Sequence, residues 1–585
     1  MLNKESGRKM MNFTAKLLGT TLLSVAISGA AQAKDLFRIA TMPAGAEVTG
    51  LSRNGLGEIF VNAQHVGGSN YLKEDGQPAT LGYLHGFDPV NYSAGNVEIP
   101  PEDARGQIHA AGAEYVVLAR AGDKLGDGKV LGGVYDTSGN LMYVSNAPDF
   151  NGFIPTSAKT AYLYTGWEGA GRDGAGAVSR LPLNRVDGKW KADLTGGMML
   201  DVSSVDGTQV VCSGTVTPWG TPLMAEEYFF FNTSVWNHPN QYDEDENPGY
   251  KGGNDITYIK PKNMMQYMGH MANPYRYGYL FEINNAATAG EYSLVKQYAT
   301  GRLSHETAAI MPDARTIYMS DDDSAKYNDK TYNTASGGVL FKFVADVKGD
   351  LSAGTLFAAK LTQDNTPDPN KAGFDIEWVE LAHGTNDQIA GWIAEYDKVT
   401  VDDYAEGQSS YISNDDIMNW AEGKAGKDLN GDGTVGSYPD DRPAFLESRR
   451  AAAALGATNE WDKLEGITSF GNTVYVGASA LSWTMDKSWG QPDWITGERD
   501  ESDGGAIALN KEDCGAVYKG VTDNSYNLSR IDPYIVGKTI EDGSCDLNLP
   551  ANPDNILALP DGSLLVGEDA GPKKHVLDML WLARE

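Results

Sequence analysis

The chain has 585 residues, of which 41% are hydrophobic and 22% charged, so it is long enough for several domains or for one large fold. Acidic residues number 79 against 47 basic ones, which gives a formal net charge of −32 at pH 7. So acidic a surface repels nucleic acid and anionic lipid and argues against both as partners. The same composition is typical of a chain with several calcium sites, although a solvated acidic surface has it too.

Residues 1–33 predict an export signal that is not part of the fold. Four basic residues accompany a short apolar run at 17–27, and Ala31-Gln32-Ala33 forms a small-x-small cleavage site. The apolar run is too short to span a membrane, and no later segment is apolar enough to do so. Cleavage would remove four basic residues and one acidic residue and take the net charge to −35. We therefore expect a periplasmic or secreted protein without a membrane partner.

The rest of the chain predicts an all-β fold. Short runs rich in Val, Ile, Tyr and Phe recur between Gly, Asn, Asp and Pro turns. A strand, a turn and a second apolar strand recur as EVTGLSRNGLGEIFVNA from Glu47, ETAAIMPDARTIYMSDD from Glu306, EGITSFGNTVYVGAS from Glu465 and DNILALPDGSLLVGEDA from Asp554. Such pairs at uneven spacing are typical of β-propeller blades with insertions between them. We expect residues 34–585 to form a single domain, a six-bladed β-propeller with helical insertions.

This fold predicts where polar residues gather. The first strand of each propeller blade lines the central channel, so Glu47, Glu306, Glu465 and Asn555 are expected to converge at one mouth of it. Converging carboxylates are unfavourable unless cations neutralise their charge. The repeats therefore favour a metal site at the mouth.

A helical insertion is predicted at about 410–460. Residues 414–425 and 443–455 have helical patterns, and DLNGDGTVGSYPDD lies between them. The residues at EF-hand-like ligand spacing are Asp428, Asn430, Asp432, Gly433 and Thr434. The twelfth position is Pro439 instead of a bidentate Glu, so Asp440 or Asp441 would have to substitute. The loop is therefore either a structural calcium site or an Asp- and Asn-rich turn.

The three cysteines divide into a pair and a single residue. In an oxidising compartment Cys514 and Cys545 can form a disulfide, which leaves Cys212 unpaired. Cys212 is either a small core residue or a metal ligand. It begins a stretch that contains Glu226 and Glu227, and thiolate suits iron, zinc or copper whereas carboxylate suits calcium. The stretch could therefore serve two metals of different character.

These motifs resemble those of the PhoX-type alkaline phosphatases, which are exported bacterial phosphomonoesterases. The matching stretches span most of the chain and are CSGTVTPWGTPLMAEE (212–227), GRLSHETA (301–308), YMSDDD (318–323) followed by GGVLFKFV, KLEGI (463–467) and PDNILALPDGSLLVGED (553–569). The resemblance implies a β-propeller whose mouth holds two iron ions bridged by an oxygen, with several calcium ions beside them. The metal ligands that it implies are Cys212, one or both of Glu226 and Glu227, Glu306, Asp322 and Glu465.

The sequence departs from the family pattern in three places. Lys463 stands where the family usually has an arginine; lysine can hold a phosphate oxygen but lacks the bidentate fork of arginine. Residues 45–65 resemble a segment that the family generally has near its C-terminus, which predicts a circular permutation or a divergent subfamily. Arg8-Lys9 stands where the family often has twin arginines, which leaves the export route open.

The expected reaction is metal-assisted phosphoryl transfer from small-molecule phosphate esters by a monomer. In this interpretation Lys463 is catalytic and pairs with a phosphate oxygen, while Cys212 is an iron ligand and not a nucleophile. His305 either assists the leaving group or packs beside Glu306. Two alternatives stay open: a calcium-dependent propeller hydrolase of lactones or esters, which has no use for Cys212, and a non-catalytic calcium-binding propeller.

Overall fold

The computed structural model describes residues 35–68, 70–169, 175–227, 233–242, 261–322, 337–489, 491–492, 499–500 and 505–585. The predicted export signal at 1–33 lies outside these residues. Within them the chain is mostly β with few helices, as predicted. No helix in these ranges is long and apolar enough to cross a membrane.

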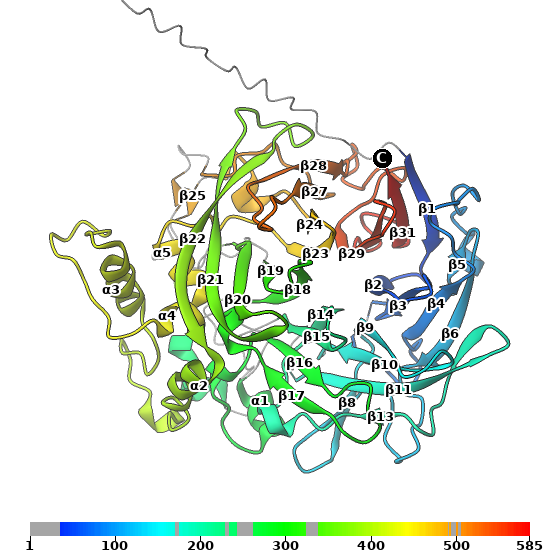
Figure 1. The fold of residues 1–585 in the computed structure, drawn as a ribbon, viewed down its shortest axis with the longest axis horizontal. Coiled ribbons are helices and arrows are strands. Elements are labelled where there is room, and N and C mark those ends of the chain that lie inside the picture. The colour runs from blue at the N-terminus through cyan, green and yellow to red at the C-terminus, as the bar shows by residue number, and fades with distance from the viewer. Residues whose placement is uncertain are drawn as a thin grey trace, which may run out of the picture.

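Six strands surround the centre of the molecule (Figure 1), and we call them the inner strands. They are β2 (Glu47–Arg53), β9 (Pro148–Pro155), β14 (Val211–Val216), β18 (His305–Ile310), β23 (Leu464–Phe470) and β29 (Pro553–Ala558). Each contacts the next, and β29 contacts β2, so the six strands form a closed ring.

The remaining strands extend outward from this ring as antiparallel sheets. The sheet of β2 continues with β3 (Ile59–Gln64), β4 (Thr80–His85) and β6 (Glu114–Arg120). That of β9 continues with β10 (Thr160–Trp167), β11 (Ala177–Val186) and β12 (Lys189–Ala192), and β13 (Met198–Met199) also pairs with β11. That of β14 continues with β15 (Pro222–Glu226), β16 (Leu280–Asn284) and β17 (Ser293–Lys296).

The sheets of β18 and β23 merge into one of nine strands. From β18 outward run β19 (Thr316–Asp321), β20 (Phe341–Val347), β21 (Asp350–Gln363) and β22 (Phe374–Thr385). From β23 outward run β24 (Thr473–Ala478), β27 (Ala516–Val521) and β28 (Arg530–Val536). The two halves join where β22 pairs with β28.

The two ends of the described chain meet in the sheet of β29. This sheet continues with β30 (Leu564–Glu568), β31 (Met579–Arg584), β1 (Asp35–Thr41) and β5 (His109–Ala110). Strand β1 pairs antiparallel with β31, with Asp35 opposite Arg584. Two small ribbons complete the described strands, β7 (Gly133–Tyr135) with β8 (Leu141–Val144) and β25 (Gln491–Pro492) with β26 (Arg499–Asp500).

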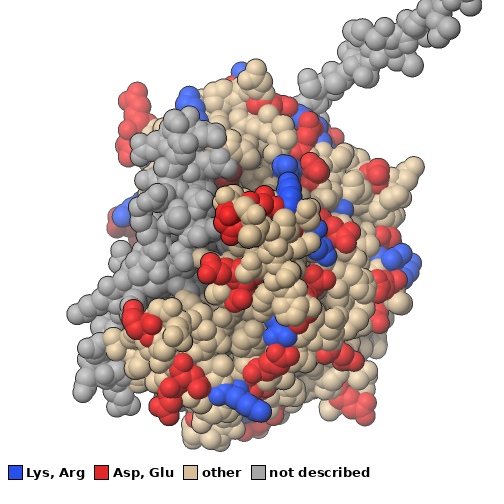
Figure 2. Space-filling view, turned by 90° about the vertical axis from the view of Figure 1, so that its left-hand side faces the viewer, with Lys and Arg blue, Asp and Glu red and all other residues tan. Residues whose placement is uncertain are grey.

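The core lies within and between the sheets. Four of the six strands next to the inner strands, β3, β15, β19 and β30, are buried at every position, as expected for strands covered on both faces. Trp167, Trp461 and Trp581 are almost fully buried. Burial of one such side chain contributes about 4–6 kcal/mol. Figure 2 shows acidic side chains spread over one face of the molecule with fewer basic ones among them.

Helices lie at 414–454, where the helical insertion is predicted, and we call this region the helical insertion. Helix α3 (Asn414–Ala425) has the predicted bounds; Ser413 and Asp416 form a capping box at its start, and Gly426 ends it at φ +65°. The helix predicted at 443–455 is two helices, α4 (Arg442–Leu446) and α5 (Ser448–Ala454), because Glu447 leaves helical geometry with φ −135°. The other helices are α1 (Pro261–Met268) and α2 (Asn386–Ala394). The 3₁₀ turns are η1 (Glu102–Ala104), η2 (Ser203–Val205), η3 (Thr233–Val235), η4 (Pro239–Gln241), η5 (Pro274–Arg276), η6 (Tyr298–Thr300), η7 (Val401–Asp403) and η8 (Trp483–Met485).

The loop after α3 is held by carboxylates of the chain itself. Glu422 accepts backbone N–H bonds from Leu429, Asn430 and Gly436, and Asp428 accepts them from Gly431 and Gly433. These contacts fit an Asx-rich turn, and calcium binding by this loop stays a prediction.

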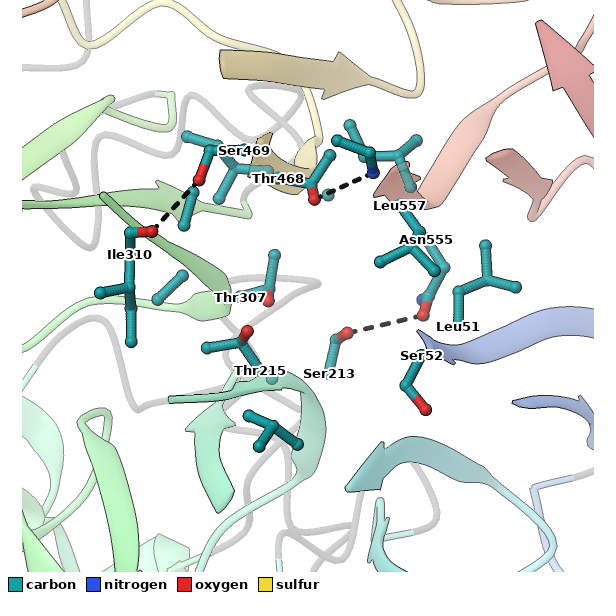
Figure 3. A pocket seen from close by; sticks show the side chains of 18 of the residues that line it. Leu51, Ser52, Ser213, Thr215, Thr307, Ile310, Thr468, Ser469, Asn555 and Leu557 are labelled. Atoms are coloured by element: carbon teal, nitrogen blue, oxygen red, sulfur yellow. Dashed lines mark hydrogen bonds between the residues drawn. The ribbon is translucent and has the colours of Figure 1, made fainter. Parts of the chain in front are cut away.

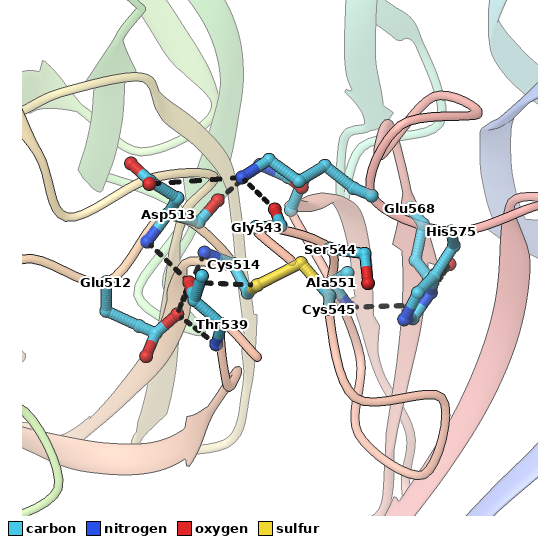
Figure 4. The surroundings of a disulfide bond; sticks show 12 residues. Glu512, Asp513, Cys514, Thr539, Gly543, Ser544, Cys545, Ala551, Glu568 and His575 are labelled. Atoms are coloured by element: carbon cyan, nitrogen blue, oxygen red, sulfur yellow. Dashed lines mark hydrogen bonds and ion pairs between the residues drawn. A yellow bond between two sulfur atoms is a disulfide. The ribbon is translucent and has the colours of Figure 1, made fainter. Parts of the chain in front are cut away.

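The predicted disulfide is confirmed. Cys514 and Cys545 are bonded, and Figure 4 shows the bond beside Thr539 and Ala551. The bridge closes a loop with a sequence separation of 31 residues, for which chain entropy predicts a stabilisation of about 3–4 kcal/mol. Cys212 is the free cysteine and is buried.

Candidate metal centre

Each inner strand begins with a residue that can bind a metal ion. The position is the second residue of the strand in five cases and the first in β2. We call these residues the inner ring, and they are Glu47, Asp149, Cys212, Glu306, Glu465 and Asp554. All six are buried. Five carboxylates and one thiol therefore converge at the start of the inner strands.

Local backbone geometry directs these side chains to the centre. In β14, β18, β23 and β29 the ladder with the neighbouring strand is irregular just where the ring residue lies, for example between His305 and Ala308. Such a bulge frees the residue from the ladder and redirects its side chain. A glycine permits the close approach: a Cβ on Gly466, next to Glu465, would lie 2.2 Å from the carbonyl oxygen of Asp554.

The inner-ring side chains lie in contact. The Cys212 sulfur lies 2.9 Å from Asp149 Oδ2 and 3.1 Å from Glu306 Oε2, so its one S–H can donate to either carboxylate. The ligand atoms of Asp149, Cys212 and Glu306 lie within 4.8 Å of one another, and so do those of Glu306, Glu465 and Asp554. Glu306 belongs to both groups and therefore links them.

A second set of residues contacts the inner ring, and we call it the second ring. It consists of the residue that directly follows the strand next to each inner strand, and these residues are His65, Glu168, Glu227, Asp322, Ser479 and Asp569. His65 Nε2 lies 2.6 Å from Glu47 Oε2, and the Ser479 hydroxyl donates to Glu465 at 3.3 Å. Each of the six sheet segments therefore contributes one residue to each ring, and the second ring adds four carboxylates to the five of the inner ring.

The electrostatics of this cluster favour bound cations. Burial, and then the charges of neighbouring carboxylates, raise the pKa values of Glu227, Glu306 and Glu465 well above the usual range. Burial also raises the pKa of Glu168 to about 8 and, with Asp149 and Glu306 beside it, that of the Cys212 thiol. Cations between these groups would reverse the effect and stabilise the deprotonated forms.

Two buried carboxylate oxygens also favour bound cations. Glu306 Oε1 and Asp322 Oδ1 are buried and have no hydrogen-bond partner among the residues that the structure describes. A buried polar atom without a partner is unfavourable by about 1–3 kcal/mol, which a metal bond would offset. The residues present therefore fit a metal cluster with both soft and hard ligands.

Lys463 lies at the rim of the cluster. Its ammonium is 2.6 Å from Glu465 Oε1 and 3.7 Å from Asp322 Oδ2. Its side chain is 32% exposed, whereas those of both carboxylates are 4% exposed. Among the described residues, Lys463 is thus the only basic side chain in an ion pair with Glu465 or Asp322, and it is accessible from solvent.

All six inner strands contribute residues to the lining of a cavity of about 340 Å³ (Figure 3). Its polar lining includes Ser213, Thr307 and Asn555, the residues that directly follow Cys212, Glu306 and Asp554. The Asn555 amide donates to Asp149 Oδ1 at 3.1 Å, so a residue of the cavity lining contacts the inner ring directly.

Comparison with known proteins identifies the family. The family model for alkaline phosphatase PhoX matches residues 194–582. The chain belongs to the PhoX alkaline phosphatase family. It is therefore an enzyme of the phosphoric monoester hydrolase class, and the match includes four of the six inner-ring residues.

Solved structures were also compared with the chain. The structure of Pseudomonas fluorescens PhoX in complex with vanadate, a transition state analogue, has 19% sequence identity and a TM-score of 0.48, over 73% of this chain and 75% of the other. A putative glucose dehydrogenase from Thermus thermophilus has 8% identity and a TM-score of 0.31, over 94% and 99%. Trypanosoma rangeli sialidase has 9% identity and a TM-score of 0.22, over 84% and 71%. No curated protein matches the sequence significantly.

The residues that the PhoX resemblance implied are brought together with one exception. Cys212, Glu227, Glu306, Asp322 and Glu465 lie in the two rings. Glu226 does not face them. Its carboxylate is fully buried and accepts hydrogen bonds from Lys296 and from the backbone of Gln209, Gly278 and Tyr279.

The structure decides between the two alternatives for His305 and changes the assignment of one ring residue. His305 is buried, its Nε2 contacts the carbonyl oxygen of Gly301 at 3.0 Å, and burial lowers its pKa to about 3. It is therefore neutral and suited to packing, not to protonating a leaving group. At the start of β29, Asp554 supplies the ring carboxylate in place of Asn555.

Sequence reasoning missed several ring residues. Asp149 and Glu168 frame another strand pair, PDFNGFIPTSAKTAYLYTGWE, which has the same form as the four repeats. Asp569 ends the repeat that begins at Asp554, and this position matches that of Glu227 and Asp322 in their sheets. Aligning the ends of the repeats, and not only their starts, would have found these residues.

Replacing Lys296 by methionine should destabilise the fold strongly. Lys296 Nζ lies 2.8 Å from Glu226 Oε1 with both side chains at most 1% exposed, so the change leaves a buried charge uncompensated. The expected loss is about 3–5 kcal/mol of unfolding free energy, measured by urea denaturation. Lys371 pairs with Asp368 at the surface, so Lys371→Met is the control and should lose about 1 kcal/mol or less. Equal losses in the two variants would contradict the assigned role of Glu226.

Proposed function

We propose that this enzyme is an exported alkaline phosphatase that hydrolyses phosphate monoesters at an iron and calcium cluster held by the two rings. The observation that carries the proposal is the inner ring, in which a buried thiol and five buried carboxylates meet with unsatisfied oxygens. The thiol favours iron over a calcium-only site, because calcium prefers oxygen ligands.

The proposal includes a six-bladed propeller formed by a single domain over residues 35–585. In support, six inner strands form a closed ring and each begins a segment of antiparallel sheet. The pairing of β22 with β28 accounts for the nine-stranded sheet as two adjacent blades joined at their outer edges. The circular permutation of residues 45–65 stays a prediction; the family match begins at residue 194 and leaves this segment outside it.

Different parts of the rings would hold different ions. Cys212, with Asp149 and Glu306, offers soft and hard donors together and would hold iron. Glu306, Glu465 and Asp554, with Asp322 and Glu227 around them, offer only oxygen and would hold calcium. When bound, these ions would supply the positive charge and Lewis acidity that phosphoryl transfer requires.

The protein's own residues would bind and orient the ester. Lys463 reaches solvent beside Glu465 and would pair its ammonium with a phosphate oxygen. Glu465 and Asp322 hold the lysine side chain at the rim, which lowers the entropic cost of binding. Cys212 lies between two carboxylates in the buried ring and would act as a ligand, not as a nucleophile.

Metal analysis tests the function directly. We expect purified protein to contain iron and calcium and to hydrolyse p-nitrophenyl phosphate. Chelation should reduce turnover by about a hundredfold or more, and adding back both metals should restore it. Protein that contains calcium without iron and cleaves lactones in preference to phosphate esters would support the alternative hydrolase instead. Full turnover after removal of both metals would refute the proposal.

Substitution of Lys463 tests the phosphate contact. Lys463→Arg should retain or improve turnover because the positive charge stays. Lys463→Ala should lower kcat/KM by about ten- to a hundredfold, since one charge-assisted contact to phosphate is lost. Lys189→Ala, which breaks an exposed ion pair with Glu114, is the control and should leave kcat/KM unchanged. Unchanged kinetics in Lys463→Ala would remove this residue from the site.

A further inference from the structure

Three strands next to inner strands end in an acidic residue, and a second acidic residue directly follows each of them. These strands are β15, β19 and β30, and the pairs are Glu226-Glu227, Asp321-Asp322 and Glu568-Asp569. The second member of each pair belongs to the second ring. The first member is fully buried in all three pairs and lies outside both rings. The first acidic residue therefore needs a different explanation.

Asp321 shows what the first member does. Its Oδ1 accepts hydrogen bonds from the backbone of Ser304 at 3.0 Å and from Arg449 at 2.5 Å. Its Oδ2 accepts them from the backbone of Val339 at 3.2 Å and from Arg449 at 2.7 Å. Ser304 lies two residues before Glu306. One carboxylate thus joins the end of β19, where Asp322 follows, to the start of β18.

The other two pairs repeat this arrangement. Glu226 accepts from the backbone of Gln209, three residues before Cys212, and from Lys296. Glu568 accepts from the backbone of Ala551, three residues before Asp554, and contacts His575 at 3.0 Å. In each sheet a buried carboxylate joins the segments that present two ring residues, and a basic side chain contacts this carboxylate. Three independent occurrences show that the contact at Asp321 is not an isolated ion pair.

The basic partner of Asp321 comes from the helical insertion. Arg449 lies on α5 and is 4% exposed. The same part of the insertion also holds the segment before β18, because Arg302 donates its backbone N–H to the Ser448 hydroxyl at 2.9 Å and to the carbonyl oxygen of Phe445 at 3.0 Å. Helices α4 and α5 therefore fix the chain immediately before Glu306.

We propose that Arg449, through Asp321, is a positioning residue that holds Glu306 and Asp322 in place for metal binding. This inference rests on the proposed function. It makes the helical insertion part of the support of the metal centre. Contacts around a metal ligand typically change metal affinity by about 10- to 100-fold when they are lost. The bidentate guanidinium contact gives a fixed orientation that a single point charge does not.

The test compares two adjacent arginines of α5. Arg449→Met removes the contact to Asp321. Arg450→Met is the matched control, because Arg450 is also buried but pairs with Glu447 and Asn414 and makes no described contact to Asp321. Full-length protein of each variant is dialysed at a series of fixed free calcium concentrations, and bound calcium per chain is measured. Melting temperatures of the same samples report stability separately.

We expect Arg449→Met to bind calcium about 10- to 100-fold more weakly than the original protein, and Arg450→Met to bind it within about threefold. Arg449→Lys should recover part of the affinity because the charge stays. Equal affinities in Arg449→Met and Arg450→Met would overturn the inference. Absence of bound calcium and iron from the original protein would instead overturn the proposed function, so the two failures are distinguishable.

A second variant tests the same contact in case Arg449→Met does not fold. Asp321→Asn keeps the size of the side chain and removes its charge, so the guanidinium contact weakens while packing is retained. It should also lower calcium affinity about tenfold or more. Unchanged affinity in Asp321→Asn would overturn the inference in the same way.

Discussion

Replacing Glu306 by glutamine should remove iron and calcium together and lower phosphatase turnover by about a thousandfold, the effect of losing several kcal/mol of charge stabilisation. Among the described residues, Glu306 is the one shared by the two groups of candidate ligand atoms, and its Oε1 has no hydrogen-bond partner there. An amide keeps the shape but is a much weaker ligand for both kinds of ion.

The sign of the stability change makes this prediction specific. With metals removed, Glu306→Gln should melt at a higher temperature than the unaltered chain, because one buried charge among several of the same sign is gone. With metals present it should melt at a lower temperature, because ligand binding no longer stabilises the fold. Glu282→Gln is the control: Glu282 is buried but bonded to Trp219 and Gln297 away from the rings, so its metal content should not change. Normal metal content in Glu306→Gln would contradict the shared-ligand role.

Replacing Cys212 by serine should lower iron content selectively. A serine hydroxyl is weakly acidic and replaces a thiolate, which binds iron far better. Phosphatase activity should fall with the iron, whereas calcium at Glu465 and Asp554 should remain. The fold should survive, because each sheet packs on its own apolar strands. Iron content, p-nitrophenyl phosphate turnover and the melting curve are the measurements.

The neighbouring residue supplies the control for Cys212. Ser213 follows it on β14 and lines the central cavity, so Ser213→Ala should leave iron content and turnover unchanged. If Cys212 is only a core residue, its serine variant should show a small stability change with iron and activity intact. Full activity in Cys212→Ser would remove the main reason for preferring iron over calcium alone.

The sequence predicted the repeats and the cysteine better than the orientation of individual side chains. In Glu226-Glu227 both residues are acidic, and successive residues of a strand point to opposite faces. The strand phase decides which one faces the rings, and the phase depends on pairing that the sequence does not specify. The bulge at the start of β29 likewise exchanges Asn555 for Asp554 as the ring residue, because an irregular ladder breaks the period of two.

The helical insertion illustrates another limit. Helix α3 was predictable because its start and end carry local signals at Ser413 and Gly426. The break at Glu447 follows from distant partners, since this carboxylate binds Thr233 and Tyr275. Such contacts join segments far apart in the chain and leave no local pattern in the sequence.

The pairing of β1 with β31 has a consequence for how the protein matures. This pairing completes the last sheet only when the first and last described strands meet, and the inner-ring residues run from Glu47 to Asp554. Such non-local contacts form late, so the metal centre cannot be assembled on a partly synthesised chain. Closure of the ring and uptake of the proposed ions would therefore be coupled, since each would stabilise the other. The compartment in which the chain folds thus determines which metals it acquires.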